Sequence, residues 1–216
     1  SASYYTKLNL TDAEASDTTV WNGTAPTSSV FSVGTSTTTN ASGGTYVAYI
    51  FAHNAGGFGL SGTDNVISCG SYTGTGTTNT LSVTLGWEPQ WIMVKKITTG
   101  GTPTIADWYV QDVMRGMPTT TNGVQLQASS SSAEGPKRWF YPTATGFMCY
   151  DNEAESNASG VTYIYIAIRR GPMKTPTLGT SVFSPNTYTG TGGTTDVAIT
   201  NFPVDRSEEH TSELQS

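Results

Sequence analysis

Two pairs of nearly identical segments constrain the fold of this chain more than any other feature. Asn-Ala-Ser-Gly occurs at 40–43 and again at 157–160, and each copy leads into a run of Tyr, Val, Ile and Ala. Tyr-Thr-Gly-Thr-Gly occurs at 72–76 and again at 188–192. Both pairs have nearly the same spacing, about 117 residues, so they predict a tandem array of one structural unit.

The matches begin and end inside a unit, which predicts parts of three units along the chain. Residues 1–52 are expected to be the C-terminal part of a preceding unit, and 69–170 a complete unit. Residues 53–68 then form a Gly-rich linker, 171–182 a second linker, and 183–205 the start of a following unit. A circular permutation, in which 1–52 pair with part of the next block, fits the same pattern and leaves the boundaries of the unit open.

The last eleven residues differ in character from the rest of the chain. Residues 206–216 read RSEEHTSELQS and interrupt the repeat directly after Asp205. They resemble a translated short-read sequencing adapter, and a natural acidic tail is the alternative. We interpret them as a non-native tail and exclude them from reasoning about the fold.

The composition favours strands and turns. Charged residues make up 12% of the chain, and its polarity comes from Thr, Ser, Gly and Asn, which are poor helix formers. Leu81, Val83 and Leu85 alternate with polar residues, which is the period of a half-buried strand. Short strands separated by Gly-rich turns predict an all-β fold made of antiparallel β-sandwich units in tandem.

Two runs are apolar on both faces. Tyr46–Ala52 and Tyr163–Ile168 are therefore expected to be central strands covered on each side. Around Asp12–Ser16 lies the one helix candidate, of a turn or two. Further short apolar runs predict strands at 91–94, 108–110 and 147–150.

A string of motifs carries a family resemblance. It begins with GSYTGTG at 70–76, continues with LGWEPQWIMVKK at 85–96, and ends with NASG at 157–160 ahead of Tyr163. Over residues 1–205 the chain resembles an uncharacterised tandem-repeat domain of tail-fibre-like structural proteins from marine and other environmental bacteriophages. The two repeated blocks differ in sequence where the second has Arg169-Arg170 and the first has Phe51-Ala52. This basic pair indicates either that the chain leaves the second unit differently or that it makes a contact between domains.

The resemblance implies a location and a set of partners. It predicts a protein of the virion tail that is extracellular when it acts, with other virion and tail proteins as partners. A homotrimer is an expectation for tail fibres in general. The resemblance implies no catalytic residues and no cofactor.

Several other classes of function are disfavoured by the residues themselves. A net charge of −6 is not the basic face that nucleic-acid binding requires, and no apolar run approaches the roughly 20 residues of a membrane-spanning helix. His53 with Asp64 would supply two metal ligands at best, so no metal site is expected. Cys69 and Cys149 are predicted to be two buried free thiols, with a single disulfide as the alternative.

An enzyme would need a catalytic constellation. A polysaccharide depolymerase of the glycoside hydrolase type needs two carboxylates that face a sugar. Asp107 with Asp112, and the acidic cluster at 151–155, are the candidates, but Asp112 is expected to pair with Arg115 and the cluster to be solvated. His53 has no Gly-x-Ser-x-Gly motif to accompany it as a general base. We therefore predict that the protein is not an enzyme.

Aromatic side chains offer the remaining candidate sites. Trp91 and Trp108 lie in strand-like runs and are expected in the core, whereas Trp139 and Tyr141 are candidates for stacking on sugars. The function predicted from the sequence is a non-enzymatic structural and adhesive module with weak, multivalent binding to host glycans. The tail depolymerase and a bacterial surface adhesin are the alternatives.

Overall fold

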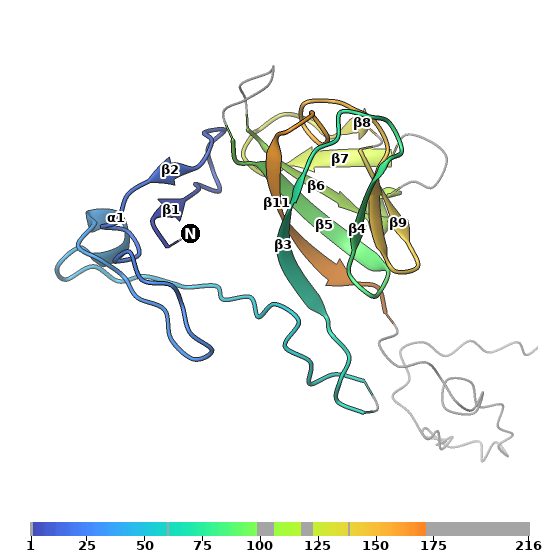
Figure 1. The fold of residues 1–216 in the computed structure, drawn as a ribbon. Helices are drawn as coiled ribbons and strands as arrows, with labels where there is room; N and C mark the ends of the chain where they lie inside the picture. The colour runs from blue at the N-terminus through green and yellow to red at the C-terminus, as the bar shows by residue number, and fades with distance from the viewer. Residues whose placement is uncertain (1, 60, 99–105, 118–122, 138, 172–216) are drawn as a thin grey trace, which may run out of the picture. The chain divides into compact units, whose positions relative to one another are not determined.

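The computed structural model describes residues 2–59, 61–98, 106–117, 123–137 and 139–171. All of them belong to one compact unit that extends to Met173. The described residues are almost entirely strand, turn and irregular structure, so the predicted all-β class is confirmed (Figure 1). The predicted following unit at 183–205 and the tail at 206–216 lie outside the described residues.

The larger sheet has six strands, and every neighbouring pair is antiparallel. Its order is β3 (Ile67–Thr73), β11 (Thr162–Arg169), β5 (Pro89–Lys96), β6 (Trp108–Asp112), β7 (Gly123–Gln127) and β8 (Gly135–Lys137). The predicted central strand at Tyr163–Ile168 is confirmed, because β11 lies between β3 and β5. The predicted strands at 91–94 and 108–110 are confirmed as parts of β5 and β6.

A smaller sheet faces the inner side of the larger one. It is antiparallel and has the order β4 (Leu81–Thr84), β10 (Gly146–Cys149) and β9 (Phe140–Thr143). The alternation at Leu81 and Val83 and the run at 147–150 thus form strands, as predicted. The two sheets enclose one hydrophobic core to which both contribute buried residues, and this is the layered arrangement of a β-sandwich.

Phe147 of β10 holds the centre of this core. Its ring is fully buried and meets Tyr72 of β3, Phe140 of β9 and Tyr165 of β11 edge to face, at centroid distances of 6.2, 5.8 and 5.5 Å. Edge-to-face packing is favourable because the positive edge of one ring meets the negative face of another. These aromatic contacts join the two sheets.

The outer face of the larger sheet carries a second, smaller cluster built around Met93, Trp108 and Val110. Part of the N-terminal block is hydrogen-bonded here. The Trp108 indole N–H donates to the carbonyl of Lys7 at 2.9 Å, and the Ala106 N–H donates to the carbonyl of Thr11 at 2.9 Å. Trp108 is therefore a packing residue, as predicted.

The N-terminal block has little regular structure. β1 (Tyr4–Tyr5) pairs with β2 (Ala15–Ser16), and a short α1 (Thr37–Asn40) is capped by Ser36, whose side chain accepts from the Thr38 N–H. A single 3₁₀ turn, η1 (Val113–Arg115), follows β6 in the sandwich.

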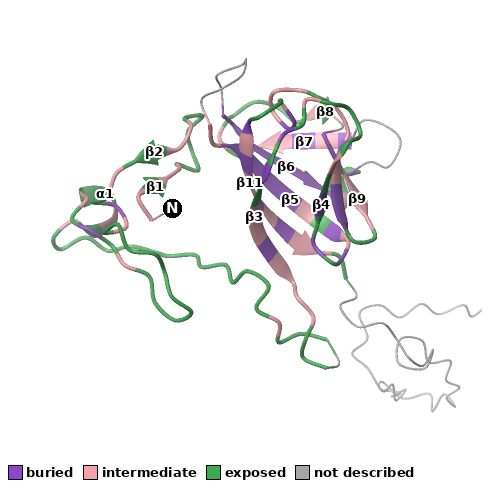
Figure 2. Ribbon diagram, in the orientation of Figure 1, coloured by how far each residue is buried: buried purple, intermediate pink, exposed green. Residues whose placement is uncertain are grey.

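Two predictions for this block are wrong. The helix expected around Asp12–Ser16 is absent: Ala15 and Ser16 form β2, and the Glu14 N–H donates to the carbonyl of Ile97 instead of closing a helical turn. The central strand expected at Tyr46–Ala52 is also absent, since the segment is not paired with a strand and is exposed (Figure 2). An apolar run forms a central strand only when flanking strands are present.

The two Asn-Ala-Ser-Gly segments nevertheless fold alike. The Tyr163 hydroxyl accepts from the Ala158 N–H at 3.0 Å and donates to the Ala154 carbonyl at 2.7 Å. In the first block the Tyr46 hydroxyl makes the same two bonds, with Ala41 at 2.7 Å and Thr37 at 3.0 Å. The same pairs of positions, about 117 residues apart, therefore close the same small loop.

Further details of this loop recur. The Asn157 amide donates to the Asp151 carbonyl at 2.9 Å, and the Asn40 amide donates to the Gly34 carbonyl at 2.7 Å. Gly160 and its counterpart Gly43 both have a φ of 73°, a left-handed conformation that favours glycine. The tandem arrangement of whole units remains a prediction, but the loop that leads into β11 is present twice.

Both cysteines are free thiols, as predicted, although only Cys149 is fully buried. Burial raises the pKa of Cys149 to about 12 and raises that of Cys69 less strongly. The thiolate is the reactive form, so Cys149 should be inert in the native state. At about pH 8, Ellman's reagent should titrate at most one thiol in the native protein and both after unfolding in guanidinium. A disulfide would leave neither thiol to titrate.

Candidate functional site

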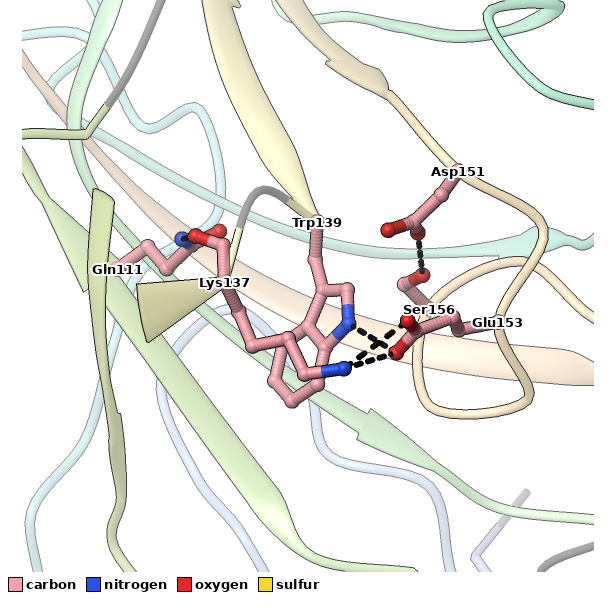
Figure 3. A network of polar contacts seen from close by, with 6 residues as sticks. All are labelled: Gln111, Lys137, Trp139, Asp151, Glu153 and Ser156. Atoms are coloured by element: carbon pink, nitrogen blue, oxygen red, sulfur yellow. Dashed lines mark hydrogen bonds and ion pairs between the residues drawn. The ribbon is translucent and has the colours of Figure 1, made fainter. Parts of the chain in front are cut away.

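A polar network surrounds Trp139 at the edge of the sandwich (Figure 3). The Lys137 ammonium, from β8, donates to both carboxylate oxygens of Glu153, at 2.9 and 2.7 Å. The Trp139 indole N–H donates to the same carboxylate at 2.9 Å, and the Lys137 ammonium lies 5.6 Å from the centroid of the indole. One carboxylate therefore ties the loop after β10 to β8 and to the indole of Trp139.

The prediction that Trp139 offers a sugar-stacking face is wrong. Its side chain is 1% exposed, and its ring packs edge to face on Tyr109 of β6 at a centroid distance of 4.2 Å. Sugar stacking needs an open ring face, and this ring is covered within the core. The sequence is misleading here because Pro136-Lys137 suggests an exposed turn, whereas Lys137 belongs to β8 and folds over the indole.

Glu153 should make the stability of the protein sensitive to acid. Burial raises the pKa of Glu153, but the hydrogen bonds from Lys137 and Trp139 outweigh it and hold the pKa below its ordinary value of 4.5. A carboxylate with a lowered folded-state pKa stabilises the fold above its unfolded-state pKa. That contribution is lost as the pH falls through the folded-state value.

Glu153→Gln should therefore flatten the acid limb of the stability profile. Urea titrations at a series of pH values below about 5 should show up to about 1 kcal/mol less acid destabilisation than in the unaltered protein, the upper end for an ion pair open to solvent. Glu134→Gln is the matched control, because Glu134 is an exposed carboxylate that pairs with Arg115. Equal acid dependence in the two variants would contradict the role of Glu153.

The pKa of the neighbouring Asp151 is shifted in the opposite direction, upward. Burial and the nearby Glu153 carboxylate raise the pKa of Asp151, and the Ser156 hydroxyl donates to it at 3.3 Å. The predicted solvated cluster at 151–155 is thus partly buried and partly engaged. Its carboxylates hold the loop that precedes β11.

Asp107 and Asp112 are each engaged with partners of their own. The Ser129 hydroxyl donates to Asp107 at 2.8 Å, and the Tyr109 hydroxyl donates to it at 3.4 Å. Asp112 accepts from the backbone N–H of Arg115 at 2.9 Å and from its Nε at 2.8 Å, which confirms the predicted pairing. Asp112 shares the face of β6 that carries Val110, whereas Tyr109 lies on the opposite, core-facing side.

Tyr141 remains a candidate for ligand stacking. It is half-buried on the outer face of the smaller sheet, and its ring lies 6.4 Å from that of Tyr150. Its hydroxyl donates to the side-chain amide oxygen (Oδ1) of Asn79 at 3.4 Å and contacts the Met148 sulfur at 3.2 Å. Two aromatic rings beside an amide are groups that recognise sugars, since the ring packs on C–H groups and the amide orients hydroxyls.

A polar hollow of about 450 Å³ lies near the exit of β11 and was missed by sequence reasoning. Its lining includes Trp87, Glu88, Arg169 and Arg170. Arg170 pairs with Glu88 at 2.6 Å, inside the predicted unit, whereas Arg169 pairs with Asp64 at 3.2 Å, in the predicted linker. The Trp87 indole nitrogen is buried and has no hydrogen-bond partner among the described residues.

The signal for this hollow was present in the repeat. Trp87 stands where the next block has Phe202. In the register fixed by Tyr46 and Tyr163, Arg169-Arg170 stand where the first block has Ala52-His53, one residue beyond the Phe51-Ala52 expected from the sequence. Positions at which repeated blocks differ are those where a unit acquires its own contacts. Both guanidinium groups on this wall are paired with carboxylates, and the Trp87 indole nitrogen is buried away from the hollow.

His53 makes a local structural contact. Its Nδ1 accepts from the backbone N–H of Cys69 at 3.0 Å, at the start of β3. Within the described ranges, no three His, Cys, Asp or Glu side chains gather in a metal-binding group. No helix in those ranges is both long and apolar enough to cross a bilayer.

Comparisons with known proteins place the chain in a family. Neither the curated proteins nor the solved structures contain a match to it. The family model described as "Domain of unknown function (DUF7483)" matches residues 1–172. Because this match covers most of the chain, the protein belongs to the DUF7483 family.

Proposed function

We propose that this protein is a non-enzymatic structural module of a virion, of the tail-fibre type, built from repeated β-sandwich units. The observation that carries the proposal is the loop that is closed by the same tyrosine bonds at Tyr46 and at Tyr163. Repetition of one folded unit serves spacing and multivalency, because each unit contacts chiefly its neighbours. The sequence resemblance to tail-fibre-like proteins supplies the location, and other tail proteins are the expected partners.

The carboxylates support a structural role over catalysis. Asp112, Asp107 and Glu153 each accept hydrogen bonds that fix a strand end or a loop. A glycoside hydrolase needs two carboxyl groups roughly 5–10 Å apart on either side of a sugar bond. Asp107 is engaged with Ser129 and Tyr109, and Asp112 with Arg115, which favours a structural role for both carboxylates.

Adhesion to host glycans is the second part of the proposal. Tyr141 and Tyr150, beside Asn79, form the aromatic surface that favours it. A single shallow site of this kind would bind weakly, and several units in one fibre would raise the avidity through effective concentration. A bacterial surface adhesin of the same architecture would use the same surface.

A binding and turnover assay on bacterial polysaccharides tests these roles together. The full chain is applied to a glycan array and, in parallel, incubated with a panel of capsular and surface polysaccharides while reducing ends are measured. We expect no release of reducing ends above a buffer control. Release that is abolished by Asp107→Asn or Asp151→Asn would replace the structural role with a depolymerase.

The array separates an adhesive module from a spacer. Binding that is lost in Tyr141→Ala and kept in Met114→Ala, a substitution at a side chain 92% exposed on η1, would assign adhesion to the tyrosine surface. If the protein unfolds cooperatively but binds no glycan on the array, the spacer role remains and the adhesive role is excluded. Peptides of the chain recovered with capsid protein in density-purified particles would support the virion location, and their absence from such particles would count against it.

A further inference from the structure

The N-terminal block contains an apolar groove that the proposed function does not use. The groove has a volume of about 860 Å³ and is lined by residues 2–51 alone. Its most exposed side chains are Tyr49 at 84%, Val47 at 79% and Ile50 at 74%. Large apolar side chains clustered and exposed in this way are typical of an interaction surface.

The repeat identifies what this groove corresponds to in the complete unit. At the spacing of the repeat, several of its lining residues match residues buried in the sandwich core. The matched pairs are Trp21 with Trp139, Tyr46 with Tyr163, Ala48 with Tyr165, and Ile50 with Ala167. The groove therefore carries counterparts of the core residues of β11 and of Trp139, whereas Val47 and Tyr49 match the half-buried Ile164 and Ile166.

In the complete unit, the other half comes from one continuous segment. Tyr163 stacks on Tyr72 of β3 at 5.0 Å, and Trp139 packs on Tyr109 of β6 at 4.2 Å. β11 is hydrogen-bonded to β3 on one side and to β5 on the other. These partners all lie within Ile67–Met117.

We infer that the groove is the acceptor site for a polypeptide segment with the strand pattern of Ile67–Met117. Such a segment would flank Tyr46–Phe51 with two antiparallel strands and convert it into the central strand of a second sandwich. Paired in this way, the segment would also satisfy the backbone groups that an isolated extended run leaves open. The inference rests on the repeat within the proposed function and is independent of virion location and of glycan binding.

The connectivity of the repeat makes the inference directly testable. Met117 is followed by Pro118, whose counterpart at the spacing of the repeat is Ser1. A copy of Ile67–Met117 joined directly to Ser1 of the full chain therefore reproduces the connectivity of the complete unit and needs no linker. We call this protein the extended chain.

Hydrogen exchange followed by mass spectrometry compares the extended chain with the full chain. Amides of Tyr46–Phe51 should exchange at least about 100-fold more slowly in the extended chain, as expected for a strand inside a cooperative fold. The amides of β11 serve as an internal standard, since they should be protected in both proteins.

Two variants of the added copy control for non-specific effects. Ile92→Asp combined with Val94→Asp alters two side chains that are fully buried in the complete unit, and should abolish the protection of Tyr46–Phe51. Gln90→Asp changes an exposed position of the same strand and should leave the protection intact.

Two results would overturn the inference. Unchanged exchange of Tyr46–Phe51 in an extended chain whose β11 amides are protected would show that the groove does not accept this segment. Protection already present in an unaltered chain that is dimeric by light scattering would assign the groove to a second copy. Neither result depends on the polysaccharide assays, so failure here and failure of the proposed function are distinguishable.

Discussion

Replacement of Trp139 by alanine is expected to lower the free energy of unfolding by about 3–5 kcal/mol, the range for a large aromatic side chain removed from a core. The indole is 1% exposed and packs on Tyr109. Its N–H also donates to Glu153, which binds Lys137. The substitution therefore leaves a cavity and removes one bond from the polar network, and urea denaturation followed by circular dichroism measures the loss.

Two further variants separate packing from ligand binding at this position. Trp139→Phe keeps most of the apolar volume and should cost clearly less than the alanine variant. Tyr141→Ala removes a half-buried ring on the outer sheet face and should also cost less. If the free energy of unfolding of Trp139→Ala is instead within about 1 kcal/mol of that of the unaltered protein, the indole is not the core residue described here.

Substitution of Gly74 by alanine is expected to destabilise the sandwich by about 3 kcal/mol, the upper part of the range for overpacking. A Cβ at Gly74 would lie 2.1 Å from the backbone oxygen of Ala158, which is not the flexible end of a side chain. The backbone of Gly74 also donates to Val161 at 2.8 Å and accepts from Gly160 at 2.9 Å. The loop between β3 and β4 and the loop before β11 would have to separate.

Gly86→Ala is the matched control for this prediction. Gly86 has a φ of 84° and no heavy atom within 4 Å of an added Cβ, so only its backbone conformation is strained. It should cost about 1 kcal/mol. Equal losses in the two variants, measured by urea denaturation, would mean that close approach at Gly74 does not explain the need for glycine there.

Local pattern was sufficient to predict most strands of the sandwich. The alternation at Leu81 and Val83 predicts a half-buried strand, and the continuous apolar run at Trp91–Val94 predicts a strand that is largely buried; both are observed. The same pattern failed at Tyr46–Ala52. Its residues resemble those of β11, but strand formation depends on neighbours that the pattern of one segment does not contain.

The candidate site was harder to predict because burial depends on distant residues. The ring of Trp139 packs on Tyr109, which lies 30 positions away, and this contact does not follow from the neighbouring sequence. Asp112 was predictable, since its partner Arg115 lies one turn away. The hollow beside Trp87 joins residues about 80 positions apart, and only the differences between the repeated blocks point to it.

A crystal structure of the extended chain tests most directly whether the chain repeats one structural unit. It shows whether Tyr46–Phe51 forms the central strand of a second sandwich, as β11 does in the first. The predicted result is a second sandwich in which Tyr46–Phe51 is hydrogen-bonded between two strands of the added copy. The ring of Tyr46 should then stack on the added copy's counterpart of Tyr72, as Tyr163 stacks on Tyr72 at 5.0 Å in the complete unit. A folded complete unit beside a Tyr46–Phe51 segment that remains unpaired would contradict the repeat of one structural unit.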